Sequence, residues 1–170
     1  PKGVMVSHGN LLDNLEMMRR RFGNHAGSTH VSWIPLYHDL GLILNLLQPL
    51  YLGATCVLMT PSGFMHRPLN WLRAIHAYGA EVAAAPNFAY HLCVDRFRAD
   101  QMDGVDLSGW KVAVNGAEPV RAVTMARFAE TFAPYGFDPA ALQPTYGLAE
   151  ATLVVSTAAA VTSGGSPTVQ

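Results

Sequence analysis

The sequence predicts an α/β protein in which βαβ units build a parallel sheet with helices on both faces. Short β-prone runs alternate with helix-prone segments of roughly ten residues, and this alternation is typical of strands joined by right-handed crossovers. A chain of 170 residues of which 50% are hydrophobic can bury a core. We find no hairpin signal between the strands, so we expect no antiparallel meander.

The first predicted helix follows Ser7, whose hydroxyl can cap it, and ends at Gly23, which suits a left-handed C-terminal turn. Its apolar face consists of Leu11, Leu15, Met18 and Phe22. Glu16 and Arg20 have the i,i+4 spacing of a stabilising ion pair. The caps and the single apolar face together predict an amphipathic helix that packs against a sheet.

The remaining elements follow from apolar runs and from the glycines and prolines between them. Residues 40–50 are predicted to form an apolar helix that Gly53 closes, and residues 54–59 a buried strand. Pro68 suits the first turn of a helix over residues 67–78. The other predicted helices are 87–97 and 119–132, and the other predicted strands are 30–33, 81–85, 111–115, 142–146 and 152–156.

Composition excludes several classes of protein. The formal net charge is -1 and no basic stripe is present, so we expect no nucleic-acid partner. No apolar run is long enough to cross a bilayer, and the chain does not begin with a signal peptide. Cys56 and Cys93 lie in apolar runs and are predicted to be buried thiols in a reducing compartment, not a disulfide or metal site. We therefore expect a cytoplasmic protein.

Candidate ligand-binding residues follow the fifth predicted strand. In an open parallel sheet, ligands bind beyond the carboxyl ends of the strands. Tyr146 offers a flat face to a base, Gly147 lets backbone approach a ligand, and Glu150 offers an oxygen ligand to a phosphate-bound Mg²⁺. The alternative is an ordinary turn with a surface glutamate.

Four segments together resemble the adenylate-forming enzymes, and most closely their fatty acyl-AMP ligase branch. They are Pro1–Val4, Trp33–Gly41, Asn115–Pro119 and Tyr146–Thr152, in the order that this family has them. The resemblance implies that residues 1–157 are a partial AMP-binding domain, belonging to the large N-terminal domain of such an enzyme. Because the chain begins without an initiator methionine, we expect a fragment. Residues 158–170 are predicted to be a loop or disordered tail that leads to the remainder.

The resemblance also implies a site for ATP and Mg²⁺. Two residues would be catalytic: His38, beside the acyl carboxylate and the α-phosphate, and Glu150, which would also bind Mg²⁺. The residues implied to bind the nucleotide are Lys2, Asn115, Gly116, Ala117, Glu118, Pro119, Thr145, Tyr146, Gly147, Leu148, Ala149 and Thr152. Among these, Lys2 would end the phosphate loop, and the turn at 115–119 would lie on one face of adenine with Tyr146 on the other.

Each implied role has a structural alternative. His38 could be a loop histidine bonded to backbone, and the turn at 115–119 could simply cap a helix. We expect Asp39 to orient His38 or cap the next helix, not to act as a base. Ala149 stands where the wider superfamily has a threonine that contacts the α-phosphate, and Thr145 or Thr152 could replace that hydroxyl.

The resemblance implies a pocket for the acyl chain at Tyr37, Asn87 and Phe88, although core packing would explain an aromatic residue at 88 equally well. The sequence thus favours a fragment of a fatty acyl-AMP ligase. Such an enzyme converts a fatty acid and ATP to acyl-adenylate and pyrophosphate, and then loads an acyl-carrier protein or polyketide synthase. The alternatives are a long-chain acyl-CoA synthetase fragment and, from another class, a non-catalytic isolated α/β scaffold.

Overall fold

A computed structural model describes residues 3–158 of the chain. Within this range six strands form one sheet in the order β2-β1-β3-β4-β5-β6. The strands are β1 (Thr29–Ser32), β2 (Thr55–Leu58), β3 (Val82–Pro86), β4 (Val112–Gly116), β5 (Leu142–Gly147) and β6 (Val154–Thr157). Every neighbouring pair is parallel except β5 and β6. Lys2 and the predicted tail, apart from Ala158, lie outside the described range.

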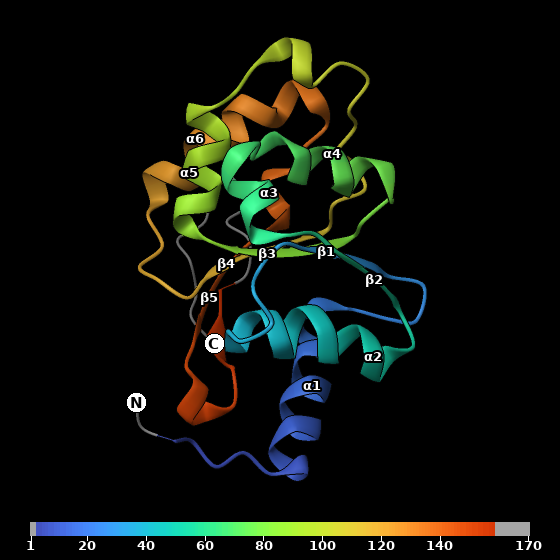
Figure 1. Cartoon of the computed structure of the whole chain (residues 1–170), viewed down its shortest axis with the longest axis vertical. Coiled ribbons are helices and arrows are strands. Elements are labelled where there is room, and N and C mark those ends of the chain that lie inside the picture. The colour runs from blue at the N-terminus through green and yellow to red at the C-terminus, as the bar shows by residue number, and fades with distance from the viewer. Residues whose placement is uncertain (1–2, 159–170) are drawn as a thin grey trace.

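Helices cover both faces of the sheet (Figure 1). On one face lie α1 (His8–Phe22), the π-helix η1 (Leu40–Leu47) and α2 (Gln48–Leu52). On the other lie α3 (Pro61–His66), α4 (Leu69–Ala77), α5 (Asn87–Asp95) and α6 (Ala122–Phe132). Short 3₁₀ turns are η2 (Ala99–Gln101), η3 (Ala133–Tyr135), η4 (Pro139–Ala141) and η5 (Ala149–Ala151). The predicted α/β class with helices on both faces is confirmed.

The local signals of α1 act as predicted. The Ser7 hydroxyl accepts a hydrogen bond from the backbone N–H of Asn10, and the Asn10 side chain accepts one from the Ser7 N–H, which completes a capping box. Gly23 ends the helix in the left-handed conformation. Glu16 pairs with Arg20 at 2.7 Å and also with Arg19 at 2.6 Å. Their guanidinium groups, Arg19 first, hold the pKa of Glu16 well below its usual range.

The segment predicted as one helix over 40–50 is a π-helix followed by an α-helix. The backbone N–H of Gln48 donates to the carbonyl of Ile43, five residues earlier. In an α-helix it would donate to the carbonyl four residues earlier. An uninterrupted apolar run predicts a buried helix of either kind, because it carries no periodicity that could distinguish the two. Gly53 closes the segment as predicted.

The position of β2 in the sheet differs from the prediction. The run 54–59 was expected to be a buried strand, but β2 is an edge strand that pairs with β1 alone, and Leu58 is half exposed. An apolar run indicates a strand but not its place in the sheet. The short helix α3 was not predicted, although Thr60 caps it through the Gly63 N–H and Pro61 opens it.

Two helices begin later than predicted. The helix expected from residue 119 begins at Ala122, because residues 117–121 form an irregular turn at the end of β4. Pro68 precedes the first residue of α4 instead of lying in its first turn. The buried face of α4 includes Leu69, Leu72 and Ile75, and that of α6 includes Phe128 and Phe132.

The last strand runs opposite to the expected direction. We expected no antiparallel pairing, but the chain reverses at η5 and β6 pairs antiparallel with β5, with a bulge between Tyr146 and Gly147. The reversal contains no Asn-Gly or Asp-Gly turn. It depends instead on Thr152, whose positive φ a sequence pattern does not predict for a β-branched residue.

Aromatic side chains fill the core between the sheet and the second helix layer. Trp71, Tyr90, Trp110 and Phe128 are fully buried and contact one another mostly edge to face. The Tyr90 hydroxyl donates to the Val114 carbonyl at 2.8 Å. Both cysteines are free thiols as predicted, Cys93 buried and Cys56 half-buried. Among residues 3–158, no helix is long and apolar enough to cross a membrane.

His30 is an unusual residue of the sheet, on the face that η1 covers. It is buried in β1, and neither ring nitrogen has a hydrogen-bond partner among the described residues. Its register neighbour Cys56 donates from Sγ to the carbonyl of Asn45 in η1, so the His30 ring faces the η1 side. Burial lowers the pKa of His30 to about 4, because a protonated ring would lose its hydration there.

This burial predicts a loss of stability in mild acid. An unfolded histidine has a pKa near 6.5, so between about pH 6.5 and 4 the unfolded chain binds more protons than the folded chain. The free energy of unfolding should fall by about 2 kcal/mol from pH 7 to 4.5 on account of His30 alone. Urea unfolding of wild type and His30→Leu at both pH values measures this difference. Equal pH dependence in the two proteins would contradict the assignment.

Candidate functional site

The loops that follow the parallel strands lie at one edge of the sheet. Because β1, β3, β4 and β5 all run in the same direction, the chain leaves each of them on that side. The loop after β1 leads to His38, the end of β3 to Phe88, the end of β4 to Ala117 and Glu118, and the end of β5 to the η5 turn. In an open α/β sheet this is the edge where ligands bind.

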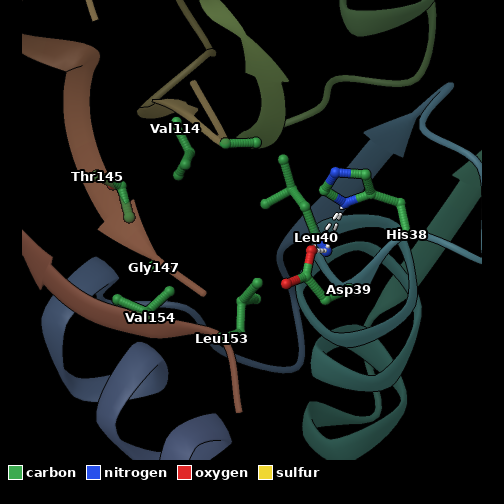
Figure 2. Close-up of a pocket in the computed structure, with 10 residues that line it drawn as sticks. His38, Asp39, Leu40, Val114, Thr145, Gly147, Leu153 and Val154 are labelled. Carbon is green, nitrogen blue, oxygen red and sulfur yellow. Dashed lines mark hydrogen bonds and ion pairs between the residues drawn. The ribbon is translucent and has the colours of Figure 1, made fainter. Parts of the chain in front are cut away.

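A pocket of about 170 Å³ lies where three of these loops meet (Figure 2). Its lining is His38, Asp39, Leu40, Val114, Gly116, Ala117, Thr145, Gly147, Leu153 and Val154. His38 and Asp39 lie on one side, with Thr145 and Gly147 opposite (Figure 2). The fold therefore brings together His38 and predicted nucleotide-binding residues that are far apart in the sequence.

A second, larger pocket of about 450 Å³ shares Ala117, Thr145 and Gly147 with the first. Its lining is Ala117, Glu118, Pro119, Val120, Pro144, Thr145, Tyr146, Gly147, Ser156, Thr157 and Ala158. The turn after β4 forms one wall and the β5–β6 hairpin the other. Tyr146 is 62% exposed, so its ring is available to a flat apolar ligand.

The His38 ring is held from one side by its neighbours. Its Nδ1 lies 2.8 Å from Asp39 Oδ1, and the Leu40 N–H lies 3.1 Å from Nδ1 and 2.7 Å from Asp39 Oδ1. When Nδ1 carries a proton, its N–H donates a hydrogen bond to Asp39 Oδ1, and the Leu40 N–H donates to the same oxygen. Asp39 thus both orients His38 and caps η1, and Nε2 is left for a ligand.

Two glycines of the site allow backbone to pack on backbone. A Cβ at Gly116 would lie 2.6 Å from the Thr145 carbonyl oxygen, and a Cβ at Gly147 would overlap the Leu153 carbonyl oxygen. We expected Gly147 to allow close approach of a ligand, whereas the close approach seen here is to the chain itself. Glycine at these positions lets β4, β5 and β6 converge below the pockets.

The two turns of the site contain strained backbone. Ala117 and Thr152 are the non-glycine residues with positive φ in the described range, at 64° and 72°. At Thr152 ψ is −65°, and the Leu153 N–H donates to the Ala151 carbonyl, which makes a γ-turn of the rare, strained kind. Such conformations persist only where surrounding contacts fix them, and they are frequent at functional sites.

Side chains brace the ends of β3 and β4 against each other. The Glu118 carboxylate accepts from the Phe88 N–H at 2.6 Å, at the start of α5. Asn87 Oδ1 accepts from the Arg121 N–H at 3.0 Å and from the Asn115 side chain at 3.5 Å. The sequence predicted neither contact, because the partners are about thirty residues apart. Asn87, expected in an acyl pocket, is buried and takes part in this brace.

Several predicted site residues do not line the two central pockets. Glu150 is exposed on η5, while Leu148, Ala149 and Thr152 form the rest of the same turn. Phe88 packs edge-on against Trp33 at 5.9 Å and lines a separate groove of about 370 Å³ with Asn87 and Glu118. Tyr37 is 94% exposed and lines none of the three.

Comparison with known proteins now defines the class. The family model of the AMP-binding enzymes matches residues 1–169, so the chain belongs to this family. The resemblance to adenylate-forming enzymes read from the four segments is thereby confirmed.

Individual relatives show which members of this family the chain resembles. The chain is 47% identical, over 92% of its length, to a medium-chain-fatty-acid–[acyl-carrier-protein] ligase of Moorena producens, and 44% identical over 92% to one of Teredinibacter turnerae. It covers 26% and 24% of these proteins, so it spans about a quarter of their length. Among solved structures, a fatty acyl-adenylate ligase from L. pneumophila in complex with acyl adenylate and pyrophosphate matches with a TM-score of 0.91 at 48% identity, covering 94% of this chain and 28% of that one.

The backbone packing at Gly147 predicts that a larger residue there destabilises the protein. Gly147→Ala places a methyl group against the Leu153 carbonyl, so the hairpin must shift and the free energy of unfolding should drop by about 1–3 kcal/mol. Gly109→Ala is the matched control, since a Cβ there meets no atom within 4 Å, and it should change stability by less than about 1 kcal/mol. Urea unfolding compares the two variants. Equal stabilities would show that the close contact is not needed.

Proposed function

We propose that this chain is part of a fatty acyl-AMP ligase, which activates a fatty acid with ATP to acyl-adenylate and pyrophosphate. One observation carries the proposal: three segments meet at one edge of the sheet. The resemblance implies that these segments bind the acyl carboxylate, the adenine and the metal ion. These are the His38 loop, the turn after β4 and the β5–β6 hairpin. The names of the two bacterial ligases and the acyl adenylate in the L. pneumophila structure support it.

The larger pocket has the form that an adenine ring needs. Residues 117–120 of the turn after β4 supply one wall, and the exposed Tyr146 ring supplies an aromatic face on the hairpin. A base stacked there would cover a ring that is otherwise in water, which is a favourable contact of about 1–3 kcal/mol in other proteins. Thr145 and Gly147 line both pockets, so the phosphates would extend from the larger pocket into the smaller one.

His38 would act where charge develops. A carboxylate oxygen of the fatty acid attacks the α-phosphorus, a new P–O bond forms, and the bond to the pyrophosphate oxygen breaks. With its ring protonated on both nitrogens, His38 would donate through Nδ1–H to Asp39 and through Nε2–H to the α-phosphate oxygens as their negative charge grows. Ala149 has no hydroxyl that could contact the α-phosphate. Thr145 lines both pockets and Thr152 neither, so Thr145 is the better replacement.

Glu150 would be the protein ligand of Mg²⁺. Within residues 3–158, no group of three acidic, histidine or cysteine side chains could hold a metal ion by itself. A single exposed carboxylate instead fits an ion that arrives with the nucleotide, since Mg²⁺ is usually bound by one or two carboxylates plus phosphate oxygens. The ion supplies charge neutralisation at the phosphates. Lys2 would add a positive charge to the same phosphates.

For the acyl chain we propose the surface around Phe88, which is 40% exposed and rests on the stacked rings of Trp33 and Phe64. Asn87 would hold this segment in place, and Tyr37 would contact the chain near His38. The acyl group would pass to an acyl-carrier protein or a polyketide synthase, in the cytoplasm. Residues 1–157 would then belong to the AMP-binding domain and the residues after them to its continuation.

Glu150 provides the test of this function. In the complete enzyme, Glu150→Gln should slow acyl-adenylate formation about a hundredfold, which corresponds to roughly 2.7 kcal/mol of transition-state stabilisation. Glu130→Gln on the exposed face of α6 is the matched control and should leave the rate unchanged. Pyrophosphate release with a medium-chain fatty acid at saturating Mg²⁺ measures both. A wild-type rate in Glu150→Gln removes the metal assignment, and no release by the wild type favours a non-catalytic scaffold.

The acceptor is tested separately. With free CoA present, the complete enzyme should keep or release acyl-adenylate, and it should form an acyl thioester only after a phosphopantetheinylated carrier protein is added. Mass spectrometry of the products distinguishes acyl-CoA, acyl-adenylate and acyl-carrier protein. Rapid stoichiometric formation of acyl-CoA would instead identify an acyl-CoA synthetase.

A further inference from the structure

Asn14 of α1 makes a two-point contact with the last strand of the sheet. Its Nδ2 donates to the Val154 carbonyl at 2.9 Å, and its Oδ1 accepts from the Val154 N–H at 3.1 Å. Val154 begins β6, an edge strand whose outer backbone groups have no neighbouring strand within residues 3–158. The primary amide therefore takes the place of a paired strand at this residue and satisfies both backbone groups at once.

The contact lies at the base of the hairpin that carries the candidate site. Val154 pairs with Gly147 across the β5–β6 ladder, and the Leu148 N–H donates to the Leu153 carbonyl at 2.9 Å. The turn with Glu150, strained at Thr152, is the segment that these pairs close, between Leu148 and Leu153. A strained turn keeps its shape only if the chain on both sides is fixed. Before the turn, pairing with β4 fixes β5 as far as Pro144, and after the turn Asn14 holds Val154.

Asn14 is itself rigidly placed. The next residue, Leu15, and Met18 one turn further are buried, α1 packs against η1 and α2, and the capping box at Ser7 fixes the start of α1. Val154 lies on the segment that passes beside α1, on the opposite side of the pocket from His38 (Figure 2). The hairpin extends past the sheet on the same side as α1 (Figure 1).

We infer that Asn14 is a positioning residue for the nucleotide site: it fixes the β5–β6 hairpin so that Tyr146 and Glu150 are held ready for ATP. This inference rests on the proposed function. Asn14 does not line the pockets, so it acts through Val154 and not by contact with a ligand. Only a side chain of this length with one donor and one acceptor makes both bonds, and leucine of similar size makes neither.

The contact is tested by amide hydrogen exchange on the complete protein. In Asn14→Leu, amides of residues 148–157 should exchange about tenfold faster than in wild type, because the hairpin opens without its anchor. Amides of β3 and β4 should exchange as before. Asp13→Asn, one residue earlier and exposed on the same helix, is the matched control and should change neither region.

The positioning role is tested by kinetics. If the competent hairpin is populated less often, the apparent affinity for ATP falls by that fraction, while saturating ATP restores the bound state. Asn14→Leu should therefore raise KM for ATP several-fold and leave kcat within about twofold of wild type. A purely structural loss would instead lower the amount of active enzyme and so reduce kcat with KM unchanged.

The conservative variant adds a pH-dependent rescue. In Asn14→Asp the ionised carboxylate can accept from the Val154 N–H but faces its carbonyl oxygen without a donor. Protonation supplies that donor, so hairpin protection relative to wild type should recover as the pH falls from 7.5 towards the ordinary aspartate pKa of about 4. Asn14→Leu should show no such recovery.

The outcomes separate the inference from the function on which it rests. Unchanged hairpin exchange in Asn14→Leu, faster exchange throughout the sheet, or a kcat effect without a KM effect each overturns the positioning role. Local faster exchange with a raised KM supports it. If the wild type forms no acyl-adenylate, the proposed function fails, and calorimetric ATP affinity replaces KM as the measurement that decides the role of Asn14.

Discussion

The parallel pairing of β1, β3, β4 and β5 is the constraint on which the candidate site depends. Parallel hydrogen bonding aligns Pro86 with Gly116 and Asn115 with Pro144, so the residues that follow each strand are neighbours in space. The loop to His38, the turn at Ala117 and the hairpin could not otherwise meet, since they are separated by dozens of residues in the chain. The helices of both layers stabilise this sheet by covering it.

Loop backbone at this edge is held largely by polar side chains. Asp39 binds the first N–H of η1, Glu118 the Phe88 N–H, Asn87 the Arg121 N–H and Asn14 both backbone groups of Val154. Each satisfies a group that neither helix nor sheet pairs, and each fixes the direction in which a loop leaves its strand. Loops fixed in this way lose less conformational entropy when a ligand binds. Because contacts of this kind also fix the surrounding backbone, the strain at Ala117 and Thr152 can be maintained.

Interpreted together, the two pockets and the hairpin form a continuous surface around Thr145 and Gly147. The apolar, aromatic wall near Tyr146 and the polar wall near His38 are of the kinds that a nucleotide needs for its base and its phosphates. The glycines beneath them bring three strands close enough for one ligand to touch all of them. The separation of Glu150 from the pocket lining fits a ligand of a metal ion held chiefly by phosphate oxygens.

The sequence by itself determined the α/β class, the caps of α1 at Ser7 and Gly23, and the segments that meet in the candidate site. Caps, periodicity and motifs are local properties of a few consecutive residues, so they can be read without a structure. The tertiary structure alone decided the edge position of β2, the reversal at Thr152, the π-helix after Asp39 and the brace of Asn87 and Glu118. Asn14 and Val154 are 140 residues apart, and nothing in either residue's neighbourhood indicates the other, because such a pair is selected by the packing of the whole sheet.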